Sequence, residues 1–168
     1  PKARGTEAHV IYRNILVPVD GSETAELGLR EAVRLAKDQG RRIRLVHVVN
    51  ELVLLSPNAY GMDLGSIFRM LVMGGEELLD RAEAEVRRAG IEVDAVLFEA
   101  MGGQAGVHIV RKALEWPADL IVCGTHGRRG LRRMVLGSDA EFVVRHSPVP
   151  VLLVRGTSPN TEELSRRE

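Results

Sequence analysis

Short apolar stretches alternate with segments of helical periodicity along most of the chain. Five stretches rich in Val, Ile and Leu predict β-strands, at Asn14–Asp20, Ile43–Val49, Ile91–Phe98, Ala118–Cys123 and Val149–Val154. Between them, apolar residues at helical spacing predict four helices, around Ala25–Ala36, Ile67–Val86, Val107–Leu114 and from Ser138 onward. Strands that alternate with helices, without hairpin turns, are typical of a parallel sheet. We therefore expect one doubly wound α/β domain, with a five-stranded parallel sheet of order 3-2-1-4-5 and helices on both faces.

Local signals refine the boundaries of these elements. Ser22 is expected to cap the first helix, and Gly40 to end it. Residues 51–65 are rich in turn-forming residues and are interpreted as a loop. Gly74 and Gly75 interrupt the longest helical pattern, at a cost of up to about 1 kcal/mol each. They predict a kink, or a boundary between a short and a long helix.

The two ends of the chain lack the alternating pattern. Residues 1–9 are polar and contain no Met, and we treat residues 1–12 as an N-terminal extension. Residues 157–168 are charged and have no periodic apolar face, which predicts a loose C-terminal tail. The domain is therefore expected to span residues 13–156, enough to bury a substantial core.

Composition excludes several classes of protein. Lys plus Arg and Asp plus Glu number 23 each, so no net charge favours nucleic acid or a membrane surface. Aromatic residues make up only 4%, too few for base-stacking platforms. No apolar run is long enough to span a bilayer. Cys123 is the only cysteine, which excludes an intramolecular disulfide and agrees with a reducing compartment. We expect neither a nucleic-acid nor a membrane partner.

A glycine motif follows the fourth predicted strand. Residues 124–127 read Gly-Thr-His-Gly, and nine residues later Gly137 and Ser138 open a helix, with Ser138 as its expected cap. Amides of a glycine-rich loop and of a helix N-terminus together form an anion site. Asp20 and Gly21 close the first strand, which neighbours the fourth in the predicted order. Ligands of doubly wound folds bind at this switch point, so the two segments predict a nucleotide site.

Plainer explanations of these residues stay open. The glycine motif could form a tight turn without a ligand, and Asp20 could simply cap the turn that follows it. His126 lies between glycines and is interpreted as a phosphate neighbour rather than a catalytic base. His47 alternates within a strand and is expected to be a core residue with a satisfied hydrogen bond. His108 and His146 lie on predicted helices without a partner pattern, so we expect no metal site in the protein.

Four of these segments together resemble the universal stress protein family. They are Val17–Ser22 (Val-Pro-Val-Asp-Gly-Ser), Val46–Val49 (Val-His-Val-Val), the Gly-x2-Gly-x9-Gly-Ser motif and the closing Pro148–Val154. The resemblance covers Asn14 to Arg155. It implies a doubly wound α/β fold, a cytoplasmic location and a homodimer joined through the last strand, Val149–Val154. One branch of the family carries the glycine motif and binds ATP, whereas another lacks it. The motif in this chain therefore implies ATP binding.

The resemblance also assigns residues to parts of the nucleotide. Pro18, Val19 and Asp20 would lie beside the nucleoside, with the Asp20 carboxylate accepting hydrogen bonds from the ribose hydroxyls. Val48 would present backbone groups to adenine. The other implied contacts are Cys123 and Gly124 below ribose and base, His126 and Gly127 near the phosphates, and Gly137, Ser138, Asp139 and Ala140 as N–H and hydroxyl donors. Mg²⁺ would accompany ATP and be held mainly by phosphate oxygens and water.

Two positions depart from the family pattern. Asp139 and Ala140 stand where family members more often carry small or β-branched uncharged residues. An aspartate suits the first turn of a helix because its charge complements the helix dipole. It would also place a negative charge near the terminal phosphates. ATP, ADP and AMP therefore all stay open as the resident ligand.

Three functions are compatible with these residues. The first is an ATP-binding regulatory or stress-response module that acts through an unknown protein partner and has no catalytic residue. The second is a slow ATPase. Adenylation is disfavoured because the segment 20–24 reads Asp-Gly-Ser-Glu-Thr rather than Ser-Gly-Gly-x-Asp-Ser, and no Walker lysine follows the glycines. The third is a chaperone-like stress dimer that has lost nucleotide binding.

Overall fold

The protein forms a layered α/β structure in the predicted order of elements. The computed structural model describes residues 12–37, 39–50, 63–126 and 136–156. The strands are β1 (Asn14–Pro18), β2 (Arg42–Asn50), β3 (Glu92–Ala100), β4 (Leu120–Gly124) and β5 (Val151–Val154). The helices are α1 (Glu23–Ala36), α2 (Leu64–Arg88), α3 (Ala105–Glu115) and α4 (Ser138–His146). Predicted loop residues 51–62, Gly127, the N-terminal extension through residue 11 and the tail 157–168 lie outside the described residues.

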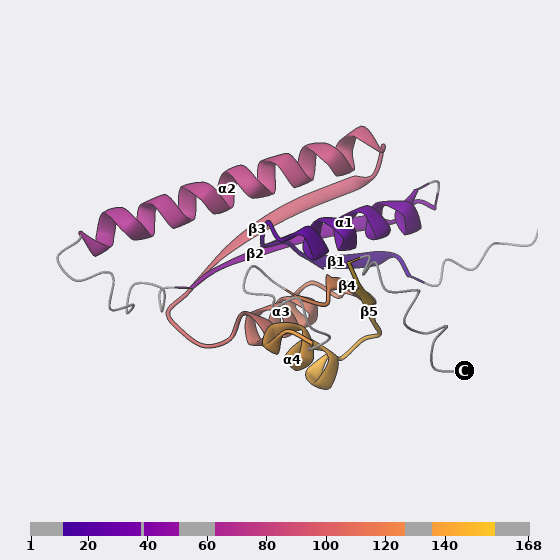
Figure 1. Cartoon of the computed structure of the whole chain (residues 1–168). Coiled ribbons are helices and arrows are strands. Elements are labelled where there is room, and N and C mark those ends of the chain that lie inside the picture. Colours follow the sequence, from indigo (N-terminus) through magenta and orange to yellow (C-terminus); the bar gives the residue numbers. More distant parts are fainter. Residues whose placement is uncertain (1–11, 38, 51–62, 127–135, 157–168) are drawn as a thin grey trace, which may run out of the picture.

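The five strands form one parallel sheet in the order β3-β2-β1-β4-β5, which confirms the predicted topology. Helices α1 and α2 lie on one side of the sheet, and α3 and α4 lie on the other (Figure 1). Alternate residues of β1 enter the two layers: Ile15 and Val17 pack toward α1 and α2, and Leu16 packs toward α3 and α4. All three are fully buried, so β1 is the centre of both cores. None of the described helices is long and apolar enough to cross a membrane.

Most helix boundaries follow from local hydrogen bonds. The Ser22 hydroxyl accepts from the Ala25 N–H at 3.3 Å and caps α1, as predicted. α2 begins earlier than its apolar pattern suggested, because the Asp63 carboxylate accepts from the Gly65 N–H at 3.1 Å and caps the helix there. Gly65, predicted as loop, therefore belongs to the first turn of α2.

The prediction of a break at Gly74 and Gly75 is wrong, since α2 is one helix of 25 residues. Gly75 is buried where α2 crosses the sheet. A Cβ atom on it would lie 2.6 Å from Cδ2 of His47 and 2.9 Å from Cδ1 of Leu97. At Gly74 a Cβ atom would meet nothing within 4 Å. Close packing of α2 on β2 and β3 therefore explains Gly75, and this packing outweighs the low helix propensity of two glycines.

The two adjacent glycines provide a matched pair for a stability test. Gly75→Ala should lower the free energy of unfolding by about 1–3 kcal/mol, because the added methyl group overpacks against His47. Gly74→Ala should raise it by up to about 1 kcal/mol, because alanine is the better helix former on open surface. Urea denaturation of both variants measures this, and equal effects of the same sign would contradict the packing explanation.

Candidate functional site

The carboxyl ends of β1 and β4 lie next to each other at one edge of the sheet. The two strands pair in parallel, with Leu16 opposite Ile121. The chain beyond β1 remains attached to β2, since the Val19 N–H donates to the carbonyl oxygen of Val46 at 2.9 Å. The segments that follow β1 and β4 run toward opposite layers from this edge, which is the switch point of a doubly wound sheet.

Asp20 is fixed by the turn that begins α1. Ser22 donates to Oδ1 of Asp20 twice, from its N–H at 2.9 Å and from its hydroxyl at 2.6 Å. Gly21 between them has a φ of 78°, in the left-handed region that favours glycine. The structure thus shows the turn-capping role of Asp20. The same bonds hold its carboxylate at the switch point.

The end of β4 packs directly against the start of α1. A Cβ atom at Gly124 would lie 2.6 Å from the carbonyl carbon of Thr24, so only glycine fits. The hydroxyl of Thr24 donates to the backbone carbonyl of His126, and the Ser22 hydroxyl, which donates to Asp20, also lies 3.3 Å from that carbonyl oxygen. These contacts bring the first half of the glycine motif beside Asp20.

Thr125 connects three elements at this edge. Its N–H donates to the carbonyl of Val154 in β5 at 3.0 Å, and its carbonyl accepts from the N–H of Gly137 at 2.9 Å. Its side chain lies 2.9 Å from Nδ1 of His126 and is buried. Thr125 therefore fixes both the start of α4 and the ring of His126 relative to β4.

The imidazole of His126 has one nitrogen that the described protein leaves unused. Its Nε2 is buried and has no hydrogen-bond partner among the described residues. Buried polar atoms are normally satisfied, so this nitrogen is a candidate contact for a polar ligand atom. Its position beside the start of α4 fits a phosphate oxygen.

The N-terminus of α4 presents free amides to the same region. Gly137 is the N-cap residue, and among the described residues no side chain is seen to cap the helix. The prediction that Ser138 is the cap is therefore wrong; Ser138 is the first helical residue, and its side chain is exposed. The amides of Ser138, Asp139 and Ala140 have no acceptor within the helix and carry the positive end of its dipole. Three of the four predicted donors thus remain for a ligand, since Gly137 already donates to Thr125.

The carboxylate of Asp139 bonds to α3. Its Oδ1 accepts from the N–H of Gly106 at 2.9 Å, while the N-cap residue of α3, Gln104, makes no cap hydrogen bond with its side chain. A Cβ atom at Gly106 would lie 2.8 Å from the carbonyl oxygen of Asp139, so the two helices meet closely. Asp139 therefore caps α3 from α4, and the dipole of α3 compensates part of its negative charge.

The other side of the switch point is formed by β2. In a parallel strand, alternate residues direct N–H and C=O to the same neighbour. Val46 accepts from Val19, so the backbone groups of Val48 also face the β1 side. Because β1 ends at Pro18, opposite Val46, these groups of Val48 lie beyond the paired stretch. His47 is buried, and its Nδ1 lies 2.7 Å from the carbonyl oxygen of Val19, which confirms its expected place in the core.

Cys123 lies at the end of β4 between the two halves of the site. Its side chain is buried, and burial raises the pKa of the thiol to about 11. The thiol is therefore protonated at neutral pH, which fits an apolar floor rather than a nucleophile. Among the described residues, no group of three or more His, Cys, Asp or Glu side chains could hold a metal ion.

The universal stress protein family matches residues 11–155, which contain every part of this site. The chain belongs to the universal stress protein family. A relative from Staphylococcus haemolyticus, also assigned to the universal stress proteins, is 33% identical over 153 residues, with 91% of this chain and 87% of the relative covered.

Solved structures agree with the assignment. Universal stress protein UspA from Lactobacillus plantarum superimposes with a TM-score of 0.74 at 25% identity, covering 86% of this chain and 98% of that one. The universal stress protein from Archaeoglobus fulgidus in complex with dAMP superimposes with a TM-score of 0.61 at 26% identity, covering 86% and 98% of the two chains.

Sequence reasoning missed three residues that shape the site of this universal stress protein. They are Thr24, Thr125 and Gly106. Thr125 lies inside the glycine motif, and a search for polar residues between its glycines would have found it. Thr24 and Gly106 act through contacts with residues 102 and 33 positions away, at His126 and Asp139. No local sequence pattern predicts such long-range contacts.

The cap across the two helices can be tested through stability. Asp139→Ala should lower the free energy of unfolding by about 1–2 kcal/mol, the usual effect of losing an N-cap side chain. Glu141→Ala is the matched control, since Glu141 lies in the same turn and only forms an exposed ion pair with Arg145. Such a pair contributes at most about 0.5 kcal/mol. If thermal or urea unfolding shows the same loss of unfolding free energy in both variants, the hydrogen bond from Gly106 to Asp139 stabilises the protein no more than an exposed ion pair does.

Proposed function

We propose that this universal stress protein binds an adenine nucleotide at the carboxyl ends of β1 and β4, and acts as a nucleotide-dependent regulatory or stress-response module. One observation carries the proposal: Asp20 and the first-turn amides of α4 flank the same switch point. Thr125 and His126 link the two sides. The dAMP complex of the Archaeoglobus fulgidus relative, at 26% identity, supports the ligand class.

The residues present fit each part of such a ligand. Asp20 would accept from the ribose hydroxyls, since its carboxylate is held in place at the end of β1. Backbone groups of Val48 would meet the polar edge of adenine. The amides of Ser138 and Ala140, with Nε2 of His126, would hold phosphate oxygens. The site residues Pro18, Val19, Cys123, Gly124, Gly127, Gly137 and Asp139 complete the proposed cradle.

We propose ATP as the resident nucleotide, with Mg²⁺ held mainly by phosphates and water. The departure at Asp139 weakens this assignment less than its charge suggests, because the carboxylate already accepts from the N–H of Gly106. When bound, the triphosphate would supply the energy-rich anhydride on which any slow hydrolysis would act.

The proposal of a regulatory module rather than an enzyme rests on the hydrogen bonds that Asp20 and Asp139 form within the protein. Asp20 bonds to Ser22, and Asp139 bonds to Gly106, so each has a structural role. We therefore propose that any ATP turnover stays below about 1 s⁻¹, the low end of typical enzymes. A slow ATPase would differ from this only in whether weak hydrolysis is measurable.

Calorimetric titration with AMP and with ATP plus Mg²⁺ tests the proposal, after any nucleotide carried through purification has been released and identified. Asp20→Asn keeps the Oδ1 acceptor of the turn but removes the charge. It should weaken binding about ten- to a hundredfold, since a hydrogen bond to a charged group contributes about 1.5–3 kcal/mol. Gly137→Val should abolish binding by placing a side chain at the phosphate cradle.

Asp119→Asn is the matched control, because Asp119 accepts from the N–H groups of Arg13 and Asn14 at the amino ends of β1 and β4, opposite the site. It should bind like the wild type. Absence of binding to a folded protein would leave the stress-dimer alternative, and ATP turnover well above 1 s⁻¹ would replace the module with an enzyme.

We also propose a cytoplasmic homodimer joined through β5. In the described structure β5 is an edge strand that pairs with β4 alone. The carbonyl of Pro150 accepts from Ile121 in β4 and that of Val154 from Thr125 just beyond it, so by alternation the backbone groups of Val151 and Leu153 face outward. Its sequence Val-Leu-Leu-Val is apolar and half-buried on both faces. An apolar edge with unpaired backbone groups favours pairing with a second copy.

Mass measurement by light scattering tests the dimer. The wild type should have twice the chain mass of 18.5 kDa. Leu153→Lys should be monomeric, because a lysine on an edge strand opposes strand pairing. Leu114→Lys makes the same change at an exposed leucine on α3 and should stay dimeric. A dimer that survives Leu153→Lys would place the interface elsewhere.

A further inference from the structure

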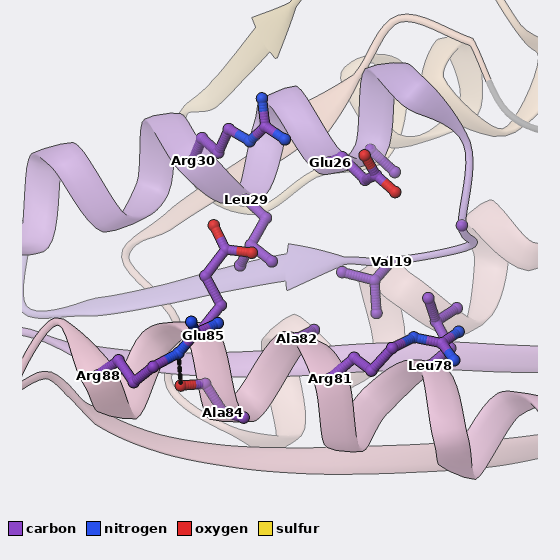
Figure 2. A pocket seen from close by; sticks show the side chains of 12 residues that line it. Val19, Glu26, Leu29, Arg30, Leu78, Arg81, Ala82, Ala84, Glu85 and Arg88 are labelled. Atoms are coloured by element: carbon purple, nitrogen blue, oxygen red, sulfur yellow. Dashed lines mark hydrogen bonds between the residues drawn. The ribbon is translucent and has the colours of Figure 1, made fainter.

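A groove separates α1 from α2 on the face of the sheet opposite α3 and α4. It has a volume of about 440 Å³, within the range of small-molecule sites. Its floor is apolar and includes Val19, Leu29 and Ala82. Leu29 from α1 points toward α2, and Glu85 from α2 points toward α1 (Figure 2). The groove has no residue in common with the α4 side of the nucleotide site.

The cations of this groove differ from those of the other helix surfaces. Outside the groove, every Arg or Lys within a described helix forms an ion pair with a carboxylate; these residues are Arg34, Arg69, Arg87, Arg111, Lys112 and Arg145. Within the described structure, the three helix cations that form none are Arg30, Arg81 and Arg88, and all three line the groove. The groove therefore collects the helix cations that form no direct ion pair among the described residues.

Charge is distributed unevenly along the groove. Arg30 and Arg88 lie toward one end together with Glu85, which gives that end a net positive charge (Figure 2). Toward the other end, Arg81 and Glu26 offset each other above apolar residues. An anion is therefore favoured at the Arg30–Arg88 end, and an apolar body is favoured along the rest of the floor.

The length of the groove suits an extended ligand. From Leu78 to Arg88 the α2 wall spans ten residues, or about 15 Å at 1.5 Å per residue. An extended hydrocarbon chain can lie along the apolar floor over this length, with one end at Arg30 and Arg88.

We propose that the α1–α2 groove is a second ligand site, which takes a single-chain amphiphile with an anionic head group. The head group, a carboxylate or a phosphate, bonds to Arg30 and Arg88, since guanidinium groups match both anions. The hydrocarbon chain lies over Leu29 and Ala82 toward Val19. Because Val19 precedes Asp20, the groove ends beside the nucleotide site without sharing its phosphate-binding residues.

Titration of the full chain with decanoate and with decyl phosphate, below their micelle concentrations, tests the proposal. Both titrations are made with the nucleotide site saturated with AMP and repeated in Gly137→Val, so that the two sites are read separately. Arg88→Ala should weaken binding about tenfold through loss of a charge-assisted hydrogen bond. Arg87→Ala is the matched control, because the neighbouring Arg87 pairs with Glu83 outside the groove.

Glu85→Gln should strengthen binding, because it removes the negative charge beside the head group. Decanol, which has the same chain length without the charge, should bind at least tenfold more weakly than decanoate. The proposal would be overturned if Arg88→Ala and Arg87→Ala lost decanoate affinity equally, or if decanol bound as tightly as decanoate. It would also be overturned if the groove bound only an acidic peptide. Nucleotide binding without any decanoate or decyl phosphate binding would overturn it while leaving the nucleotide site intact.

Discussion

The close approach of Gly124 to Thr24 is the constraint on which the rest of the site depends. A gap too small for a single Cβ atom brings the end of β4 against the first turn of α1. Only then can the hydroxyls of Thr24 and Ser22 reach the carbonyl of His126. A side chain at Gly124 would separate the two segments, and Asp20 would no longer lie beside the glycine motif.

A second set of contacts transmits this geometry to the phosphate side. Thr125 accepts from Gly137 through its carbonyl and so places the N-terminus of α4. Asp139 in that first turn then caps α3 at Gly106. The candidate site of this universal stress protein is therefore linked by hydrogen bonds and close contacts from one side of the sheet to the other.

The fold could be predicted almost entirely from the sequence, because apolar strands and amphipathic helices each fit one position in a right-handed, doubly wound order. The candidate site could be placed as far as its residues follow strands or begin helices: Asp20 lies two residues beyond the end of β1, and Gly137 is the N-cap residue of α4. The predictions that failed concern residues whose roles depend on contacts with distant parts of the chain. From the sequence, Gly75 resembles a helix breaker, and only its contact with His47 explains why glycine is needed there. The hydrogen-bond partner of Asp139, Gly106, lies 33 residues away in the sequence. No local pattern contains such information.

The most direct test of the central claim is to map AMP binding on backbone amides by NMR. If the nucleotide binds at the carboxyl ends of β1 and β4, the largest shifts should occur at Asp20, at His126 and at Ser138 to Ala140, with little change in the α1–α2 groove around Leu29 and Glu85. Largest shifts in that groove, or none at the N-terminus of α4 in a protein that binds AMP, would contradict the claim that the nucleotide lies at the carboxyl ends of β1 and β4.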